Sequence, residues 1–206
     1  MTMEDAFDVV RKRGIYMQEA VPTGGAMTAV LGLDPEKIEE ICKETAQKES
    51  AVVSIANYNC PGQIVITGQK DAVDKAAAAC SEAGAKRAVP LKVSGPFHSK
   101  MLEGAGEKLG EALKDVEIHD IKVPYITNVT ADYVASKDDV KDYLKRQVSS
   151  SVRWQQTIER LIADGADEFI EIGPGRSLAG FMRKINRDVK VVNIDKLEDF
   201  EKYVNR

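Results

Sequence analysis

Residues 52–68, VVSIANYNCPGQIVITG, decide the fold class of this chain. Two apolar runs, 52–58 and 63–68, are joined by Asn-Cys-Pro-Gly, which is a strong turn signal between neighbouring strands. The flanking segments predict four further elements: a strand at 26–33, a helix at 35–48, a helix at 71–83 and a strand at 86–93. Residues 26–93 therefore have the order β-α-β-β-α-β of the split βαβ, or ferredoxin-like, unit.

The rest of the chain alternates helices with short apolar strands. The predicted elements are helices at 3–20, 101–115, 137–147, 152–164 and 177–186, and strands at 123–129, 168–172 and 189–194. This alternation is typical of a parallel sheet covered by helices, so the whole chain belongs to the α/β class. In the first helix, Phe7, Val10 and Met17 are expected to lie near one face.

Composition narrows the function classes. The 206 residues are 43% hydrophobic and 30% charged, and the net charge of -4 argues against a nucleic-acid-binding protein. Cys42, Cys60 and Cys80 lie far apart without a CxxC pair, so we expect no disulfide framework and no zinc site. No apolar run approaches the ~20 residues that span a bilayer, and the first residues do not resemble a signal peptide. We expect a soluble protein of the cytoplasm, with neither nucleic acid nor membrane as partner.

His98 is the first candidate for chemistry. It follows the apolar run 89–93 and a Gly-Pro turn, and it precedes a predicted helix, so its ring lies at a strand-to-helix connection. Imidazole accepts and returns protons near neutral pH. The alternative is a packed or helix-capping histidine. The second histidine, His119, precedes a predicted strand, and we assign it only a surface position.

A base needs a nucleophile, and the usual G-x-S-x-G turn is absent from the sequence. The nearest imitation surrounds Ser177, which we interpret as a helix cap. Cys60 is the other candidate, although a small buried cysteine is the commoner interpretation. Arg13 offers a planar, permanently charged group that matches a carboxylate at two points, but composition alone does not separate it from Arg11 or Lys12.

Six different short motifs follow one another along the chain. They are Arg13-Gly14 with Met17-Gln18-Glu19-Ala20 and Gly25-Ala26-Met27, Asn57-x-Asn59-x-Pro61-Gly62-Gln63-x-Val65-x-x-Gly68, Val93-Ser94-Gly95-x-Phe97-His98-Ser99, Asn128-Val129, Val152-Arg153-Trp154, and Glu171-Ile172-Gly173-Pro174-Gly175. Together they resemble malonyl-CoA:acyl-carrier-protein transacylases of fatty acid synthesis, from about residue 3 to the end of the chain.

The resemblance implies a fold and a reaction. Members of that family have a large α/β-hydrolase-like subdomain into which a ferredoxin-like subdomain is inserted. Carried onto this chain, residues 1–24 and 94–206 would belong to the large subdomain and residues 25–93 to the insert. A serine takes the malonyl group from coenzyme A and then passes it to the phosphopantetheine thiol of acyl carrier protein. Malonyl-CoA is a substrate of this reaction, and no bound cofactor is implied.

The resemblance also implies site residues. His98 would be the general base, and Arg13 would bind the free carboxylate of the malonyl group. The main-chain carbonyl of Arg153 would orient the imidazole. Phe97 would narrow the acyl pocket against a branched methylmalonyl group, and Asn59 would contribute to substrate binding.

Two family segments are not found in these residues: the Gly-Gln-Gly-Ser-Gln oxyanion segment and the Gly-His-Ser-Leu-Gly turn with the nucleophile. The resemblance places both before Met3. We therefore expect the C-terminal two thirds of a transacylase, truncated ahead of the base and without the serine. The absent strands would leave one side of the parallel sheet apolar and unpaired. Such a chain would not transfer malonyl alone, and a separate N-terminal fragment would be its partner.

Two other hypotheses remain. In the second hypothesis, the chain is a non-catalytic module that binds coenzyme A or acyl carrier protein, with a basic stretch facing an acidic carrier. The basic residues of that stretch are Arg176, Arg183, Lys184 and Arg187. A solvated helix face explains the same charges. In the third hypothesis, Cys60 and His98 form a cysteine acyltransferase.

Overall fold

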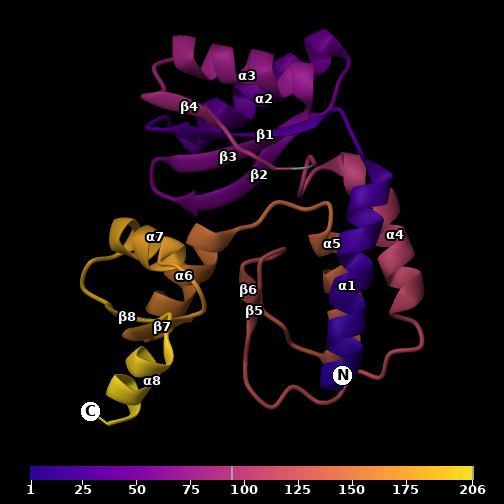
Figure 1. The fold of residues 1–206 in the computed structure, drawn as a ribbon. Coiled ribbons are helices and arrows are strands. Elements are labelled where there is room, and N and C mark those ends of the chain that lie inside the picture. Colours follow the sequence, from indigo (N-terminus) through magenta and orange to yellow (C-terminus); the bar gives the residue numbers. More distant parts are fainter. Residues whose placement is uncertain (94, 206) are drawn as a thin grey trace.

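The computed structural model describes residues 1–93 and 95–205. Ser94, which belongs to the motif before His98, lies outside the described residues. Figure 1 shows a sheet covered by two helices at the top, and below it a longer N-terminal helix beside several short helices and strands. No helix of the described residues is both long enough and apolar enough to cross a membrane.

The predicted hairpin forms the middle of a four-stranded antiparallel sheet. Its strands are β1 (Gly25–Leu31), β2 (Val53–Cys60), β3 (Gln63–Gln69) and β4 (Arg87–Pro90). They lie in the order β2-β3-β1-β4, so β3 and β1 are central. The two strands of the hairpin pair with a register shift between Ile55 and Asn57, which is a β-bulge in β2.

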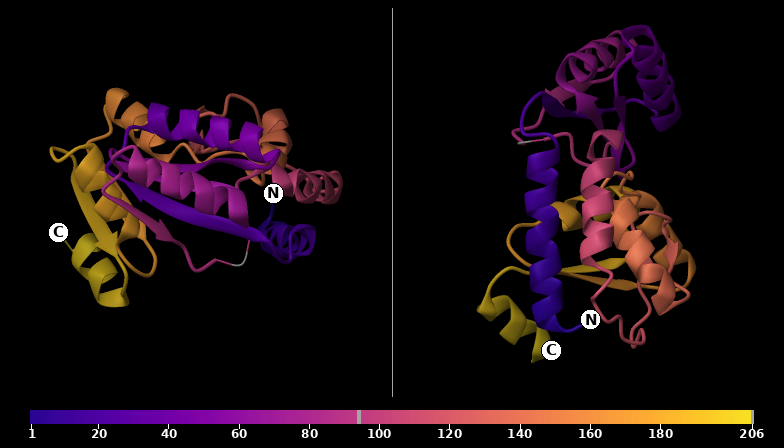
Figure 2. Two further views of the ribbon diagram at one scale, coloured as in Figure 1. Left: turned by 90° about the horizontal axis from the view of Figure 1, so that it is seen from above. Right: turned by 90° about the vertical axis from the view of Figure 1, so that its right-hand side faces the viewer.

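Two helices cover one face of this sheet, α2 (Pro35–Glu49) and α3 (Lys70–Glu82) (Figure 1 and Figure 2). A buried apolar cluster joins them to the strands, and its fully buried members include Val30, Ile38 and Ile64. The element order β-α-β-β-α-β is therefore confirmed. Burial of each such side chain stabilises the fold by roughly 1.5–3 kcal/mol.

The opposite face of the sheet contacts the rest of the molecule through Phe97. The phenyl ring packs against a cluster that includes Met27 and Val65, and it also packs against the core below. Pro96 is held directly on β1, because a Cβ on Gly25 would lie 2.2 Å from its Cδ. Glycine at this position therefore allows the loop that carries His98 to touch the sheet.

The core below the sheet is helical. It contains α1 (Met3–Ala20), η1 (Lys100–Leu102), α4 (Glu103–Ala112), η2 (Lys137–Asp139) and α5 (Val140–Gln147). Thr2 caps α1 by accepting a hydrogen bond from the Asp5 N–H. Val9 and Met17 are buried, whereas Phe7 and Val10 are 71% and 67% exposed, so the predicted apolar face of α1 was wrong. The apolar residues of α1 form two stripes, one buried and one exposed, and the prediction from the sequence treated them as a single face.

The remaining part contains β5 (Ile126–Thr127), β6 (Asp132–Tyr133), α6 (Trp154–Ala163), β7 (Glu168–Ile172), α7 (Ser177–Ile185), β8 (Lys190–Ile194) and α8 (Leu197–Val204). Strands β7 and β8 are parallel, as predicted. The strand predicted at 123–129 differs: only β5 forms, and it pairs antiparallel with β6 instead of joining a parallel sheet. A tight turn between Thr127 and Ala131 reverses the chain there. Helix α8 was not predicted.

Ser177 does not cap α7, which corrects the sequence interpretation. It is the first residue of the helix, and the preceding Arg176 makes no side-chain cap bond. The carboxylate of Glu171, at the end of β7, accepts from the N–H groups of Leu178 at 3.1 Å and Ala179 at 2.9 Å. A carboxylate from a neighbouring strand thus satisfies the helix N-terminus that a local serine was expected to satisfy.

Candidate active site

A pocket of roughly 420 Å³ lies where α1 meets the sheet. Its lining comes from α1, β1, β2 and the loop before η1: Arg13, Gly14, Met17, Gln18, Met27, Asn57, Phe97 and His98. The structure therefore brings His98, Arg13 and Phe97 together, although they are separated along the chain. An imidazole and a guanidinium therefore line the same pocket.

The backbone at His98 is held in an unusual conformation. Its φ of 59° lies in the left-handed region, which is uncommon for a residue with a side chain and concentrates at functional sites. The next residue, Ser99, is buried and accepts from the N–H of Met101, so the chain enters η1 directly after the ring. The imidazole is therefore fixed at the junction of a loop and a helix.

One ring nitrogen of His98 has a main-chain partner. Nδ1 lies 3.1 Å from the carbonyl oxygen of Gln147. A carbonyl only accepts hydrogen bonds, so Nδ1 carries the proton and Nε2 has the free lone pair. This is the tautomer that a general base requires.

The prediction that the carbonyl of Arg153 orients the imidazole of His98 is wrong in this structure. That carbonyl accepts from the N–H of Thr157 at 3.0 Å, inside the first turn of α6. Gln147 instead ends α5, and the last four carbonyls of a helix lack intrahelical partners. The predicted end of the helix at 147 was the signal in the sequence that marked an available carbonyl.

Burial is the main influence on the ionisation of His98. It lowers the pKa of the imidazole below its usual value, and the charge of Arg13 lowers this pKa further. Hydrogen bonding to the carbonyls of Gln147 and Ser150 acts in the opposite direction. The net lowering keeps the ring neutral, and therefore basic at Nε2, at neutral pH.

Arg13 differs from its basic neighbours. Lys12 pairs with Asp8 at 2.6 Å, and the Arg11 side chain is 69% exposed beside the same carboxylate. Arg13 is half-buried, and burial lowers the pKa of its guanidinium. Its Nε is buried without a hydrogen-bond partner among the described residues. A buried cationic donor without a partner is suited to an anionic ligand.

Asn57, rather than Asn59, faces this pocket. Asn59 is half-buried and is not among the lining residues. The β-bulge before Asn57 changes the direction in which side chains leave β2, and such a bulge cannot be seen in the sequence pattern. Gln18 is a second polar lining residue that was not predicted from the sequence, although it belongs to the motif Met17-Gln18-Glu19-Ala20.

The described lining of the pocket contains no hydroxyl or thiol group. Cys60 is fully buried outside it, and burial raises the pKa of its thiol, so the reactive thiolate is disfavoured. Both observations argue against a cysteine nucleophile paired with His98. The described residues also include no cluster of three or more His, Cys, Asp or Glu side chains that could hold a metal ion.

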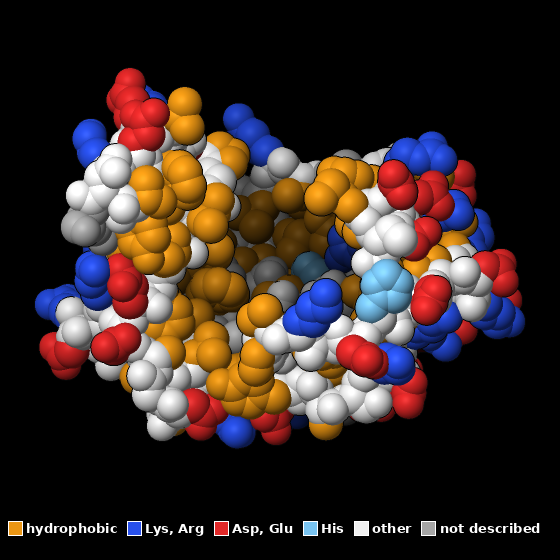
Figure 3. Space-filling view, turned by 90° about the horizontal axis from the view of Figure 1, so that it is seen from below, with side chains coloured by type: hydrophobic (Ala, Val, Ile, Leu, Met, Phe, Trp, Pro, Cys, Tyr) orange, Lys and Arg blue, Asp and Glu red, His pale blue; other side chains and the backbone are white. Residues whose placement is uncertain are grey.

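Exposed apolar side chains gather around a hollow on the underside of the molecule (Figure 3). The exposed large apolar residues of the chain include Phe7, Ile172 and Leu197, each more than 70% exposed. Among the described strands, β7 pairs only with β8, so its other edge is open. An open strand edge beside exposed apolar side chains is the surface expected where a further element packs.

The family model for the acyl transferase domain matches residues 1–195. The chain belongs to the acyl transferase domain family. Among curated relatives of this family, the malonyl CoA-acyl carrier protein transacylase of Bacillus subtilis is 46% identical over 202 residues. The match covers 98% of this chain and 63% of the relative.

Solved structures of acyl transferases have the same fold. The malonyl CoA-acyl carrier protein transacylase from Clostridium perfringens superposes with a TM-score of 0.94 at 41% identity, covering all of this chain and 64% of that one. A malonyl-transacylase in complex with a type II PKS acyl-carrier protein gives a TM-score of 0.92 at 40% identity, covering 98% of this chain and 65% of that one. The chain thus spans just under two thirds of the length of these relatives.

The lowered pKa of His98 predicts a specific pH dependence of stability. The unfolded chain binds the proton more readily, so the free energy of unfolding is highest above about pH 6.5. It falls as the pH drops from that value through the lower pKa of the folded state. In His98→Asn, which tolerates a positive φ, this part of the pH dependence should vanish. Urea unfolding of both proteins at pH 7.5 and 5.5 measures the free energy of unfolding at each pH. If this free energy changes equally between the two pH values in both proteins, the assignment is contradicted.

Proposed function

We propose that this chain supplies the general base and the carboxylate-binding residue of a malonyl-CoA:acyl-carrier-protein transacylase. The convergence of His98 and Arg13 on one pocket carries the proposal. A neutral imidazole with a free Nε2 suits proton transfer, and an unpaired guanidinium suits a substrate with a free carboxylate. Membership of the acyl transferase domain family and the names of the relatives support this choice of substrate.

In the proposed reaction, Nε2 of His98 takes the proton of a serine hydroxyl as the oxygen attacks the malonyl thioester. The C–S bond breaks, and the imidazolium returns the proton to the coenzyme A thiol. In the second half, the same nitrogen takes the proton of the phosphopantetheine thiol. The sulfur attacks the malonyl ester, and the serine oxygen leaves with the proton. Gln147 keeps the imidazole in the required tautomer throughout.

Two pocket residues would select the acyl group. Arg13 would form a two-point ion pair with the malonyl carboxylate, away from bulk water. Phe97 would limit the width of the pocket, so that the extra methyl of a methylmalonyl group is excluded. Because Phe97 packs against two cores, its ring cannot move aside cheaply.

The serine and the oxyanion donors would come from a segment outside these 206 residues. The described pocket lining offers no nucleophile, and the relatives are longer than this chain. The open edge of β7 and the exposed apolar side chains around the hollow (Figure 3) suit an apolar segment that adds a strand there. Such a segment belongs either to the same polypeptide or to a separate N-terminal fragment.

The proposal includes the finer fold description. Residues 25–93 would be the inserted ferredoxin-like subdomain, with 1–24 and 94–206 as the remainder of an α/β-hydrolase-like subdomain. The observed strand order of the four-stranded sheet supports the first part. A cytoplasmic location fits three free, buried cysteines, and the chemistry requires no bound cofactor.

Complementation tests the proposed function. The fragment would be the part of the Bacillus subtilis relative that this chain does not match. We expect no malonyl labelling from radioactive malonyl-CoA with the chain alone, labelling of the fragment's serine when both are mixed, and transfer to carrier protein when they are fused. An inert fused protein would contradict the function; an active fusion with an inert mixture would contradict only assembly from two chains.

The carboxylate role of Arg13 predicts a selective defect. In the fused protein, Arg13→Gln should lower malonyl transfer by on the order of 10- to 100-fold, since a charge-assisted interaction is worth about 1.5–3 kcal/mol. Transfer of acetyl, which has no carboxylate, should not fall. Arg11→Gln on the same helix is the matched control, because Arg11 is exposed and does not line the pocket. Equal losses for both acyl groups would mean that Arg13 is only structural.

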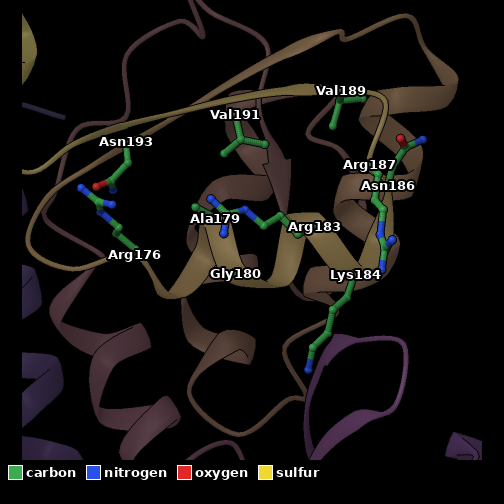
Figure 4. Close-up of a pocket in the computed structure, with 10 residues that line it drawn as sticks. All are labelled: Arg176, Ala179, Gly180, Arg183, Lys184, Asn186, Arg187, Val189, Val191 and Asn193. Carbon is green, nitrogen blue, oxygen red and sulfur yellow. The ribbon is translucent and has the colours of Figure 1, made fainter.

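A second candidate function, a module that binds a carrier protein without catalysis, is favoured by a basic groove. Helix α7 and β8 line a groove of roughly 810 Å³. Arg176 and Arg187 lie at its opposite ends, Arg183 runs along α7 between them, and the Lys184 side chain points away from β8 (Figure 4). None of these four side chains forms an ion pair in the described part of the chain, and Lys184 donates only to Gln63. Positive charges left unpaired in one groove complement an acidic protein surface.

Calorimetry distinguishes the two functions. The chain alone should bind an acidic acyl carrier protein, and Arg183→Glu with Arg187→Glu should weaken the dissociation constant by about ten-fold or more. Lys48→Glu, an exposed basic residue on α2, is the control and should have no effect. Carrier binding without any labelling in the complementation assay would favour the module. Unchanged binding by the double variant would exclude the groove.

A further inference from the structure

The segment that joins α5 to α6, residues 148–153, is bonded to the free edge of β2. The Ser151 hydroxyl donates to the carbonyl of Ile55 at 2.6 Å, and the N–H of Val152 donates to the carbonyl of Ala56 at 2.7 Å. Figure 1 shows this connection passing directly beneath the sheet. Two consecutive residues of the segment are thus bonded to two consecutive carbonyls of the strand.

The edge of β2 is available for a structural reason. Strand β2 lies at the end of the sheet order, so only one of its edges pairs with β3. The N–H of Tyr58 donates to the carbonyl of Val152 at 2.9 Å, and Asn57 and Val152 form an isolated parallel bridge. The segment therefore acts as a very short extra strand at the position where β2 contributes Asn57 to the pocket.

The same segment also reaches the base. The carbonyl of Gln147, just before it, lies 3.1 Å from Nδ1 of His98, and the main chain of Ser150 raises the pKa of the ring. The Ser150 carbonyl and the Ser151 N–H belong to one rigid peptide unit. Whatever fixes Ser151 therefore fixes the direction of the Ser150 carbonyl.

We propose that Ser151 is a positioning residue for His98. Its hydroxyl, bonded to Ile55, is one restraint on the 150–151 peptide, and the backbone bonds of Val152 are the other. Together they hold the segment that begins directly after Gln147, and so they keep the carbonyl of Gln147 directed at Nδ1, which leaves Nε2 free. The importance of this tautomer rests on the proposed function, but the positioning itself does not require that malonyl transfer occurs.

Nuclear magnetic resonance on the chain itself tests the proposal. His98 and His119 are the only histidines in the sequence, so long-range ¹⁵N–¹H spectra resolve the two rings, and a His119→Asn variant assigns them. In Ser151→Ala, the ratio of the Nδ1–H to the Nε2–H tautomer of His98 should fall about five-fold, the ratio that corresponds to one neutral hydrogen bond. The pKa of His98 should fall as well, because a carbonyl partner that raises it is loosened.

Ser149, two residues before Ser151, offers a matched control variant. The Ser149 hydroxyl has no hydrogen bond to any described residue, so Ser149→Ala should leave the tautomer ratio unchanged. An equal ratio in the Ser149→Ala and Ser151→Ala proteins overturns the proposal. If Ser151→Ala does not fold, Ser151→Thr and Ser151→Val, which match in shape and differ in the hydroxyl, replace it. Only the threonine variant should keep the original ratio, and equal ratios overturn the proposal.

Discussion

The contact of Phe97 with two hydrophobic cores is the interaction on which the site depends. On one side the ring packs against the uncovered face of the antiparallel sheet, and on the other against the helical core of α1 and α4. Pro96 lies against Gly25 in the same loop. His98 follows directly, so the position of its imidazole is determined by the junction between the two parts of the molecule. Any change that separates these parts would move this imidazole relative to Arg13.

Local patterns predicted the parts of the fold that depend on near neighbours. The alternating and continuous apolar runs around the Pro61-Gly62 turn predicted the hairpin, and the six-element unit was found with that hairpin at its centre. The patterns did not reveal what each face contacts. Phe7 and Val10 form an apolar stripe that remains exposed, and residues 123–129 form a two-residue strand with a different partner. Both depend on tertiary neighbours that are distant in sequence.

The site shows the same division. His98, Arg13 and Phe97 were predicted from residue chemistry and a family resemblance, and they share one pocket. The partner of the imidazole was misplaced by six residues, because which helix-end carbonyl reaches Nδ1 depends on how α5 packs. Asn57 replaced Asn59 in the pocket lining for a comparable reason, since a bulge changes side-chain direction without any signal in composition.

The unpaired Nε of Arg13 would link this architecture to selectivity under the proposed function. A cationic donor that is partly removed from water and has no partner among the described residues raises the free energy of the empty pocket. A ligand carboxylate removes that penalty, whereas an acyl group without a carboxylate fills the pocket and leaves the donor unpaired. Discrimination of this kind is larger than an added attraction alone provides, because the wrong ligand also displaces water that would otherwise solvate the charge. Selectivity for a dicarboxylic acyl group would then follow from keeping Arg13 without an acidic neighbour, while Asp8 pairs with Arg11 and Lys12 on the exposed side of the same helix.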